Sequence, residues 1–175
     1  MNNFTTDDNW QREVRNNILA PYYKSVSHES RFVFLDKGKL ADRLQREFAI
    51  DTIVQGKNNA VFGIEEKIVR WPGYTYSAYT LEIMSCSVPG RERKGWMYTA
   101  TCDFLFYCFV QADGKSIVAH MIPFQKLQKW FFENERYQAY RSNFTDQINK
   151  TETKIVPIKD VWQAIPECKK RFILS

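Results

Sequence analysis

The segment AIDTIVQGKNNAVFGIEEKIVR, residues 49–70, carries the clearest structural pattern of this chain. It holds two apolar runs, 50–54 and 60–64, on either side of the residues Gly-Lys-Asn-Asn at 56–59. Two apolar runs around a turn rich in glycine and asparagine predict a β-hairpin. We therefore take this hairpin as the element around which the rest of the chain is organised.

The charged residues of this hairpin lie where its two strands begin and end. Asp51 is at the head of the first strand, and Glu65, Glu66 and Lys67 come at the end of the second. Because side chains alternate along a strand, Glu65 and Lys67 are expected on one face and Glu66 on the other. Two carboxylates beside an ammonium can hold a divalent cation next to a group that handles protons.

The composition is that of an ordinary globular protein. Of its 175 residues, 44% are hydrophobic and 26% charged, which predicts a single domain over residues 1–175 with a sizeable core. Aromatic residues make up 15%, enough to fill a core or to stack on bases. A net charge of +5 and a pI near 9.0 favour an anionic partner, although a basic solvated surface explains the same balance.

The cysteines and the N-terminus exclude several classes of protein. Four cysteines contain no CxxC pair and do not cluster with the two histidines, which argues against a zinc site. The first residues lack the basic-then-apolar pattern of a signal peptide, and no apolar run is long enough to cross a membrane. We therefore expect a protein of the reducing cytoplasm, without membrane contact.

The segments around the hairpin alternate between helical and strand patterns. Apolar spacing predicts helices over 10–18, 40–48, 124–131 and 159–165, and a loosely helical stretch over 133–150. Pro21 is expected to end the first helix. Strands are predicted at 31–35, 74–85, 116–122 and 154–158, with an Asp-Gly hairpin turn at 112–115. This order predicts an α/β or α+β domain with a central mixed β-sheet flanked by helices.

The triplet Glu65-x-Lys67 by itself is a weak signal, because the pattern (Asp/Glu)-x-Lys occurs four times. The other three matches are Asp113–Lys115, Glu152–Lys154 and Glu167–Lys169. A turn, a polar loop and a solvated tail explain those three. Only Glu65 leaves an apolar strand and follows a second strand that bears an isolated aspartate. Its context therefore sets it apart from the others.

In this context the chain resembles the PD-(D/E)xK nuclease superfamily, also called restriction-endonuclease-like. Asp51 matches the first acid of the family pattern, Glu65 the second acid and Lys67 the lysine. Ile50 stands where the family often has a proline. The string IDTIV…IEEKIVR…TLEI…KGW…CDFLFY is similar to uncharacterised phage and bacterial proteins of this fold, over roughly residues 40–130.

The resemblance implies a metal-dependent endonuclease, a hydrolase of phosphodiester bonds with DNA as the expected substrate, in a bacterial or phage-infected cell. Asp51 and Glu65, with the backbone carbonyl of Glu66, would bind Mg²⁺ or Mn²⁺. Glu82 would add a ligand through water. Lys67 would orient or deprotonate the attacking water and offset charge in the transition state.

Several basic residues near this motif, in loops or in the C-terminal tail are candidates for contacts with nucleic-acid phosphates. They are Arg70, Arg91, Arg93, Lys94, Lys169 and Lys170. Arg70 has the strongest case, because it follows Lys67 closely and precedes Trp71, a stacking surface. For each of these residues taken singly, a solvated surface charge is the commoner explanation.

Other functions stay open at this point. The same fold could be a catalytically inactive protein of phage or bacterial origin that binds nucleic acid or inhibits a host protein. The aromatic content would also suit a structural or small-molecule-binding α+β protein. In that case Glu65 and Lys67 would form only a salt bridge at a strand end. A homodimer and a protein partner are compatible with each of these functions.

Overall fold

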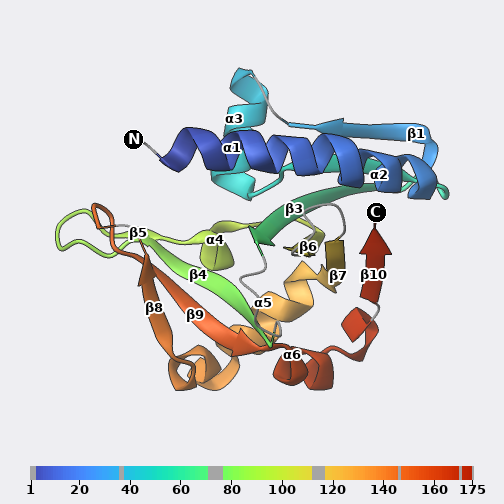
Figure 1. Ribbon diagram of the computed structural model, residues 1–175. Coiled ribbons are helices and arrows are strands. Elements are labelled where there is room, and N and C mark those ends of the chain that lie inside the picture. The colour runs from blue at the N-terminus through green and yellow to red at the C-terminus, as the bar shows by residue number, and fades with distance from the viewer. Residues whose placement is uncertain are drawn as a thin grey trace.

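The computed structural model has a six-stranded central sheet and a second sheet of four strands (Figure 1). It describes residues 3–35, 38–70, 77–111, 117–145, 147–169 and 171–174. The central strands, in spatial order, are β1 (Ser27–Phe34), β2 (Thr52–Gly56), β3 (Val61–Arg70), β6 (Phe104–Val110), β7 (Ile117–Pro123) and β10 (Arg171–Leu174). β3 and β6 run parallel and the other neighbours antiparallel, which confirms the predicted mixed sheet.

The predicted hairpin is formed by β2 and β3, paired from Thr52 opposite Ile64 to Gln55 opposite Val61. In its turn Asn59 has a φ of 65°, a left-handed conformation that asparagine tolerates better than most residues. β3 has ten residues and β2 only five, so the second half of β3 extends beyond β2. Glu65 and Lys67 lie in this extension.

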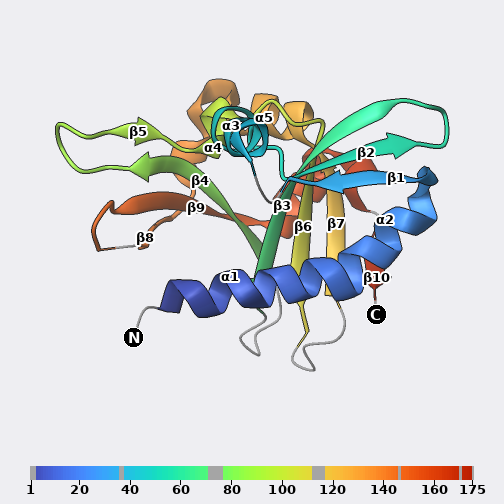
Figure 2. The ribbon, with the colours of Figure 1, turned by 90° about the horizontal axis from the view of Figure 1, so that it is seen from above.

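One face of the central sheet packs against the N-terminal helices, which lie above it in Figure 1 and cross it in Figure 2. Alternate strand residues such as Ile64, Ile68 and Phe106 form an apolar core with Ile18 and Tyr23 of these helices. The helical segments are α1 (Asn3–Val14), the π-helical η1 (Arg15–Leu19) and α2 (Ala20–Val26).

The prediction that Pro21 ends the first helix was wrong, because the helical run continues to Val26. The π-helical turn makes the backbone N–H of Ala20 donate to the carbonyl of Arg15, five residues back. Pro21 then lies in the first turn of α2, where a residue without an N–H is tolerated.

The opposite face of the central sheet carries Leu105, Tyr107 and Phe109 and packs into a second, larger core. This core is shared with the second sheet and with the helices that follow the strands. Those helices are α4 (Trp96–Thr99), α5 (Phe124–Phe132) and α6 (Ile158–Ala164). The predicted helices at 124–131 and 159–165 are therefore confirmed within one residue or so of their ends.

The second sheet was not predicted. Its strands, in spatial order, are β5 (Arg93–Lys94), β4 (Ala78–Cys86), β9 (Thr151–Pro157) and β8 (Ser142–Thr145). β4 thus pairs with β9, about seventy residues away, while β6 becomes the parallel neighbour of β3. Residues 133–150 hold a short 3₁₀ helix, η2 (Glu133–Ala139), and β8 in place of the loosely helical stretch.

The C-terminal tail, expected to be solvated, is part of the fold. A 3₁₀ helix, η3 (Pro166–Lys169), leads into β10, which pairs with β7 and places Phe172 opposite Ala119. The predicted turn at 112–115, Trp71, Lys170 and the side chain of Lys169 lie outside the described residues. In the part of the chain described here, no helix is long and apolar enough to cross a membrane.

Candidate functional site

The helix before the hairpin places Asp51 at the open edge of β3. α3 (Lys39–Phe48) ends at Ala49, whose left-handed φ of 48° turns the chain toward the sheet. The backbone N–H of Asp51 donates to the carbonyl of Ile64 over 2.9 Å. Its carboxylate Oδ2 then accepts the N–H of Glu66 over 2.9 Å. The Asp51 side chain therefore takes the place that a backbone carbonyl of β2 would have.

Glu65 and Lys67 lie on the face of β3 that is turned toward the second sheet. Lys67 Nζ is 2.6 Å from Glu65 Oε1, and the Glu65 side chain is 7% exposed against 32% for Lys67. The Lys67 ammonium also lies 5.0 Å from the centre of the Trp96 ring. The pair is thus largely shielded from water on the side of α4, and the ammonium keeps partial access to solvent.

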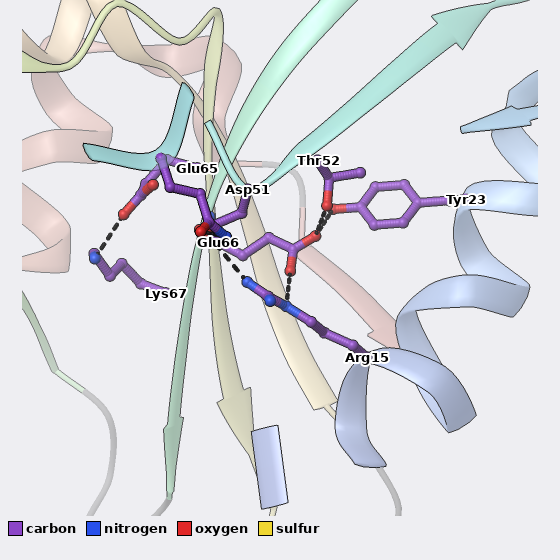
Figure 3. A network of polar contacts seen from close by, with 8 residues as sticks. Arg15, Tyr23, Asp51, Thr52, Glu65, Glu66 and Lys67 are labelled. Carbon is purple, nitrogen blue, oxygen red and sulfur yellow. Dashed lines mark hydrogen bonds and ion pairs between the residues drawn. The ribbon is translucent and has the colours of Figure 1, made fainter. Parts of the chain in front are cut away.

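Glu66 points to the opposite face, as predicted, and its side chain is fully buried. Oε1 accepts hydrogen bonds from Tyr23 Oη over 2.9 Å and from Thr52 Oγ1 over 2.7 Å. Oε2 accepts from Arg15 Nε over 2.7 Å. Figure 3 shows this carboxylate between the N-terminal helix and the sheet. A buried carboxylate with three donors stays ionised only while those donors remain.

Arg15 joins the two faces, because its Nη2 is 3.3 Å from Asp51 Oδ1 while its Nε holds Glu66. The charged side chains of the site thus form two sets of ion pairs. Lys67 pairs with Glu65, and Asp51 pairs with Arg15, which pairs with Glu66 (Figure 3). The carboxylates of Glu65 and Asp51 are neighbours of like charge, because the charge of Asp51 raises the pKa of Glu65, and both carboxylates act on the Lys67 ammonium.

The electrostatics of these neighbours follow from burial and from each other. Burial raises the pKa of Glu65 to about 7; the nearby Lys67 lowers it, and the charge of Asp51 adds to the rise. Burial opposes the charged form of Lys67, but the carboxylates of Glu65 and Asp51 outweigh it and raise its pKa. Lys67 is therefore an ammonium at neutral pH, which favours orienting a water molecule over deprotonating one.

The carboxylates of Asp51 and Glu65 and the backbone carbonyl of Glu66 offer oxygen atoms, the ligands that a small hard cation such as Mg²⁺ prefers. In an extended residue the N–H and C=O point to the same neighbour, so the carbonyl of Glu66 faces the same edge as Asp51. Mg²⁺ is commonly bound by one or two carboxylates and keeps several waters. No cluster of three or more histidine, cysteine or acidic side chains suited to a metal occurs among the described residues. Asp51, Glu65 and the Glu66 carbonyl would therefore supply two carboxylates and one carbonyl, with water molecules as the other ligands.

The other predicted site residues are distributed around this centre. Glu82 on β4 is partly buried, and its charge contributes to the raised pKa of Lys67, so it lies beside the site. Arg70 stacks its guanidinium 4.5 Å from the ring centre of Trp10, so α1 holds it. Lys94 is exposed and lies 5.1 Å from the ring centre of Tyr98. Arg91 and Arg93 are exposed on the loop around β5.

Sequence reasoning missed Arg15, Tyr23 and Thr52, which hold Glu66. In the predicted helix over 10–18, Arg15 falls on the polar side, away from the apolar line of Val14 and Ile18. The signal that could have found it is the position of the fully buried Leu19, four residues later and thus on the same helical face. No local pattern indicates that this face would meet residue 66.

The raised pKa of Glu65 predicts a pH-dependent stability. A carboxyl whose pKa rises from 4.5 to about 7 on folding stabilises the protein below pH 4.5 and loses this contribution as pH rises through 7. We expect the wild type to lose about 3 kcal/mol relative to Glu65→Gln between pH 4.5 and pH 8. Urea denaturation at several pH values measures this. Glu133→Gln, an exposed control, should follow the wild type, and parallel curves for Glu65→Gln would contradict the assignment.

Comparison with known proteins identifies no relative, so the site is described from its geometry alone. The chain matches no protein-family model, no curated protein and no solved structure.

Proposed function

We propose that this protein is a metal-dependent nuclease with a restriction-endonuclease-like fold. The observation that carries the proposal is the pair of neighbouring carboxylates, Asp51 and Glu65, between an ammonium on one side and a guanidinium on the other. Two acids in mutual repulsion gain most from a shared cation, and the charge of Asp51 is one cause of the raised pKa of Glu65, after burial.

The arrangement of the strands supports the resemblance. Asp51 directly precedes β2, Glu65 and Lys67 lie on its antiparallel neighbour β3, and the sheet is mixed and flanked by helices. These are the positions of the acids and the lysine in the PD-(D/E)xK pattern. The connection from β3 to β6 is longer than the simplest form of this pattern requires, because it contains β4, β5 and α4.

The residues suggest a division of roles in phosphodiester hydrolysis. Asp51, Glu65 and the carbonyl of Glu66 would hold Mg²⁺ or Mn²⁺, which polarises a phosphate and lowers the pKa of a bound water. The Lys67 ammonium would orient the water and offset charge on the phosphoryl oxygens. Trp96 and the burial of Glu65 keep bulk water from one side of the site, which strengthens these electrostatic effects.

Cleavage of supercoiled plasmid and of a labelled single-stranded oligonucleotide tests this function, with Mg²⁺, Mn²⁺ or EDTA. We expect cleavage that needs a divalent ion and that Asp51→Asn and Glu65→Gln each reduce by about 100-fold or more. Glu133→Gln is the matched control. Cleavage that survives both site substitutions would show that the activity belongs elsewhere.

One observation favours a second function, that of an inactive protein on the same fold that binds nucleic acid. Both carboxylates already have a protein cation, Arg15 on Asp51 and Lys67 on Glu65, so the centre is partly neutralised without a metal. Salt-dependent binding to DNA without cleavage in any divalent ion would support this function. Thermal stabilisation of the wild type, but not of Asp51→Asn, by Mn²⁺ would instead support the metal site.

A further inference from the structure

The loop between β4 and β5 forms a pocket with the turn before β9. Its volume is about 380 Å³, within the range of small-ligand pockets, and it is lined by Cys86, Arg91, Glu92, Arg93 and Asn149. The buried Cys86 lies at the end of β4, while Arg91, Glu92 and Arg93 are exposed. The nuclease chemistry proposed above makes no use of this pocket.

The two walls of the pocket are held together by hydrogen bonds. Ser87 donates its backbone N–H to the carbonyl of Asn149 over 3.0 Å and its hydroxyl to the carbonyl of Lys150. Thr151 Oγ1 donates to the carbonyl of Ser85 over 3.2 Å. These bonds join the end of β4 to the start of β9 on both sides of the turn. These bonds therefore hold the Cys86 side of the pocket against the turn that carries Asn149.

The charge of the pocket points to an anion. Within the described part of the chain, neither Arg91 nor Arg93 forms an ion pair. A guanidinium is always charged and presents paired N–H groups that match the oxygens of a phosphate. Glu92 also lines the pocket and offsets one of the two positive charges. The remaining net charge of the three side chains is +1, which favours an anion as the ligand.

β5 connects this pocket to the candidate metal centre over a short distance. Arg93 is three residues before Trp96, at most roughly 10 Å of extended chain, and Trp96 contacts Lys67. Gly95 lies so close to β4 that a Cβ there would be 2.6 Å from the carbonyl oxygen of Glu82. Its N–H donates to Ile83 over 2.8 Å. β4 therefore fixes the separation between pocket and centre.

We propose that the Arg91–Arg93 pocket is a second phosphate-binding site. Resting on the proposed function, its ligand is a backbone phosphate of the strand that is cut, a few nucleotides from the bond at Lys67. Lys94, the next residue of β5, is exposed and lies over the Tyr98 ring. This pocket gives the enzyme a contact that holds one side of the substrate strand without taking part in hydrolysis.

Binding of a fluorescent oligothymidine of roughly twelve nucleotides, within the usual span of single-strand sites, tests this pocket in EDTA, where no cleavage occurs. The dissociation constant is measured over a series of salt concentrations for Arg91→Gln/Arg93→Gln. Losing two phosphate contacts should reduce the slope of log K against log salt by about 1.4. Lys129→Gln/Lys159→Gln removes two exposed charges of α5 and α6, outside the pocket, and should keep the slope. Glu92→Gln should tighten binding.

A second arm separates a nucleic-acid strand from a free phosphate as the source of the ligand. One outcome is that inorganic phosphate stabilises the wild type against heat but not Arg91→Gln/Arg93→Gln, while the wild type and this variant have the same oligothymidine slope. The pocket then binds small phosphates and not a strand. Equal slopes in both double variants, with no stabilisation by phosphate, would overturn the site. Because these measurements need no metal, a failed nuclease function leaves their outcome intact.

Discussion

Lys67→Met should lower metal-dependent cleavage by at least about 100-fold, the usual cost of removing one group that stabilises transition-state charge. The ammonium is 2.6 Å from Glu65 and is the cation of the centre with partial access to solvent. Its loss removes the group that orients the water and also raises the pKa of Glu65 further, so that this acid is protonated at neutral pH. Single-turnover cleavage rates across a range of Mn²⁺ concentrations measure both effects.

The control for this variant is Lys24→Met, which removes an exposed lysine of α2. It should cleave at the wild-type rate. Lys67→Arg keeps a positive charge and a group that can stack on Trp96, and it should recover part of the activity. A Lys67→Met protein that folds normally and cleaves at the wild-type rate would remove Lys67 from the mechanism.

Arg15→Met should destabilise the protein by about 3–5 kcal/mol at pH 8, because it leaves the fully buried carboxylate of Glu66 without its cation. Burial already raises the pKa of Glu66, and Arg15 is the main charge that lowers it. Without Arg15 this pKa rises further, so Glu66 binds a proton and the loss of stability should be smaller at pH 5. Urea denaturation at the two pH values measures the difference.

The double variant Arg15→Met/Glu66→Gln distinguishes charge from packing. Glutamine keeps an acceptor for Tyr23 and Thr52 but carries no charge. If the unpaired charge causes the loss, the double variant should recover at least about 2 kcal/mol of it at pH 8 and lose the pH dependence. Equal stability of the single and double variants at both pH values would mean that Arg15 acts through packing alone.

The hairpin and the faces of its charged residues could be predicted from local sequence patterns. The turn residues at 56–59 and the apolar runs beside them act over a few positions, so β2 and β3 pair as predicted. Alternation along a strand places Glu65 and Lys67 together and Glu66 opposite them. The position of Asp51 next to Glu65 follows from the same short hairpin. These features depend on interactions between near neighbours in the chain, which a local pattern contains.

The surroundings of this hairpin could not be predicted, because they depend on tertiary contacts. Arg15 meets Glu66 across 51 residues, and a π-helical turn carries the helix past Pro21. β4 pairs with β9 in the second sheet and not with β3, and the Arg70 guanidinium stacks on the Trp10 ring. The contacts of Arg15 with Glu66, of β4 with β9 and of Arg70 with Trp10 join segments that lie far apart in the sequence. The energy of such pairs depends on burial and on partners far along the chain, and no spacing within one segment encodes it.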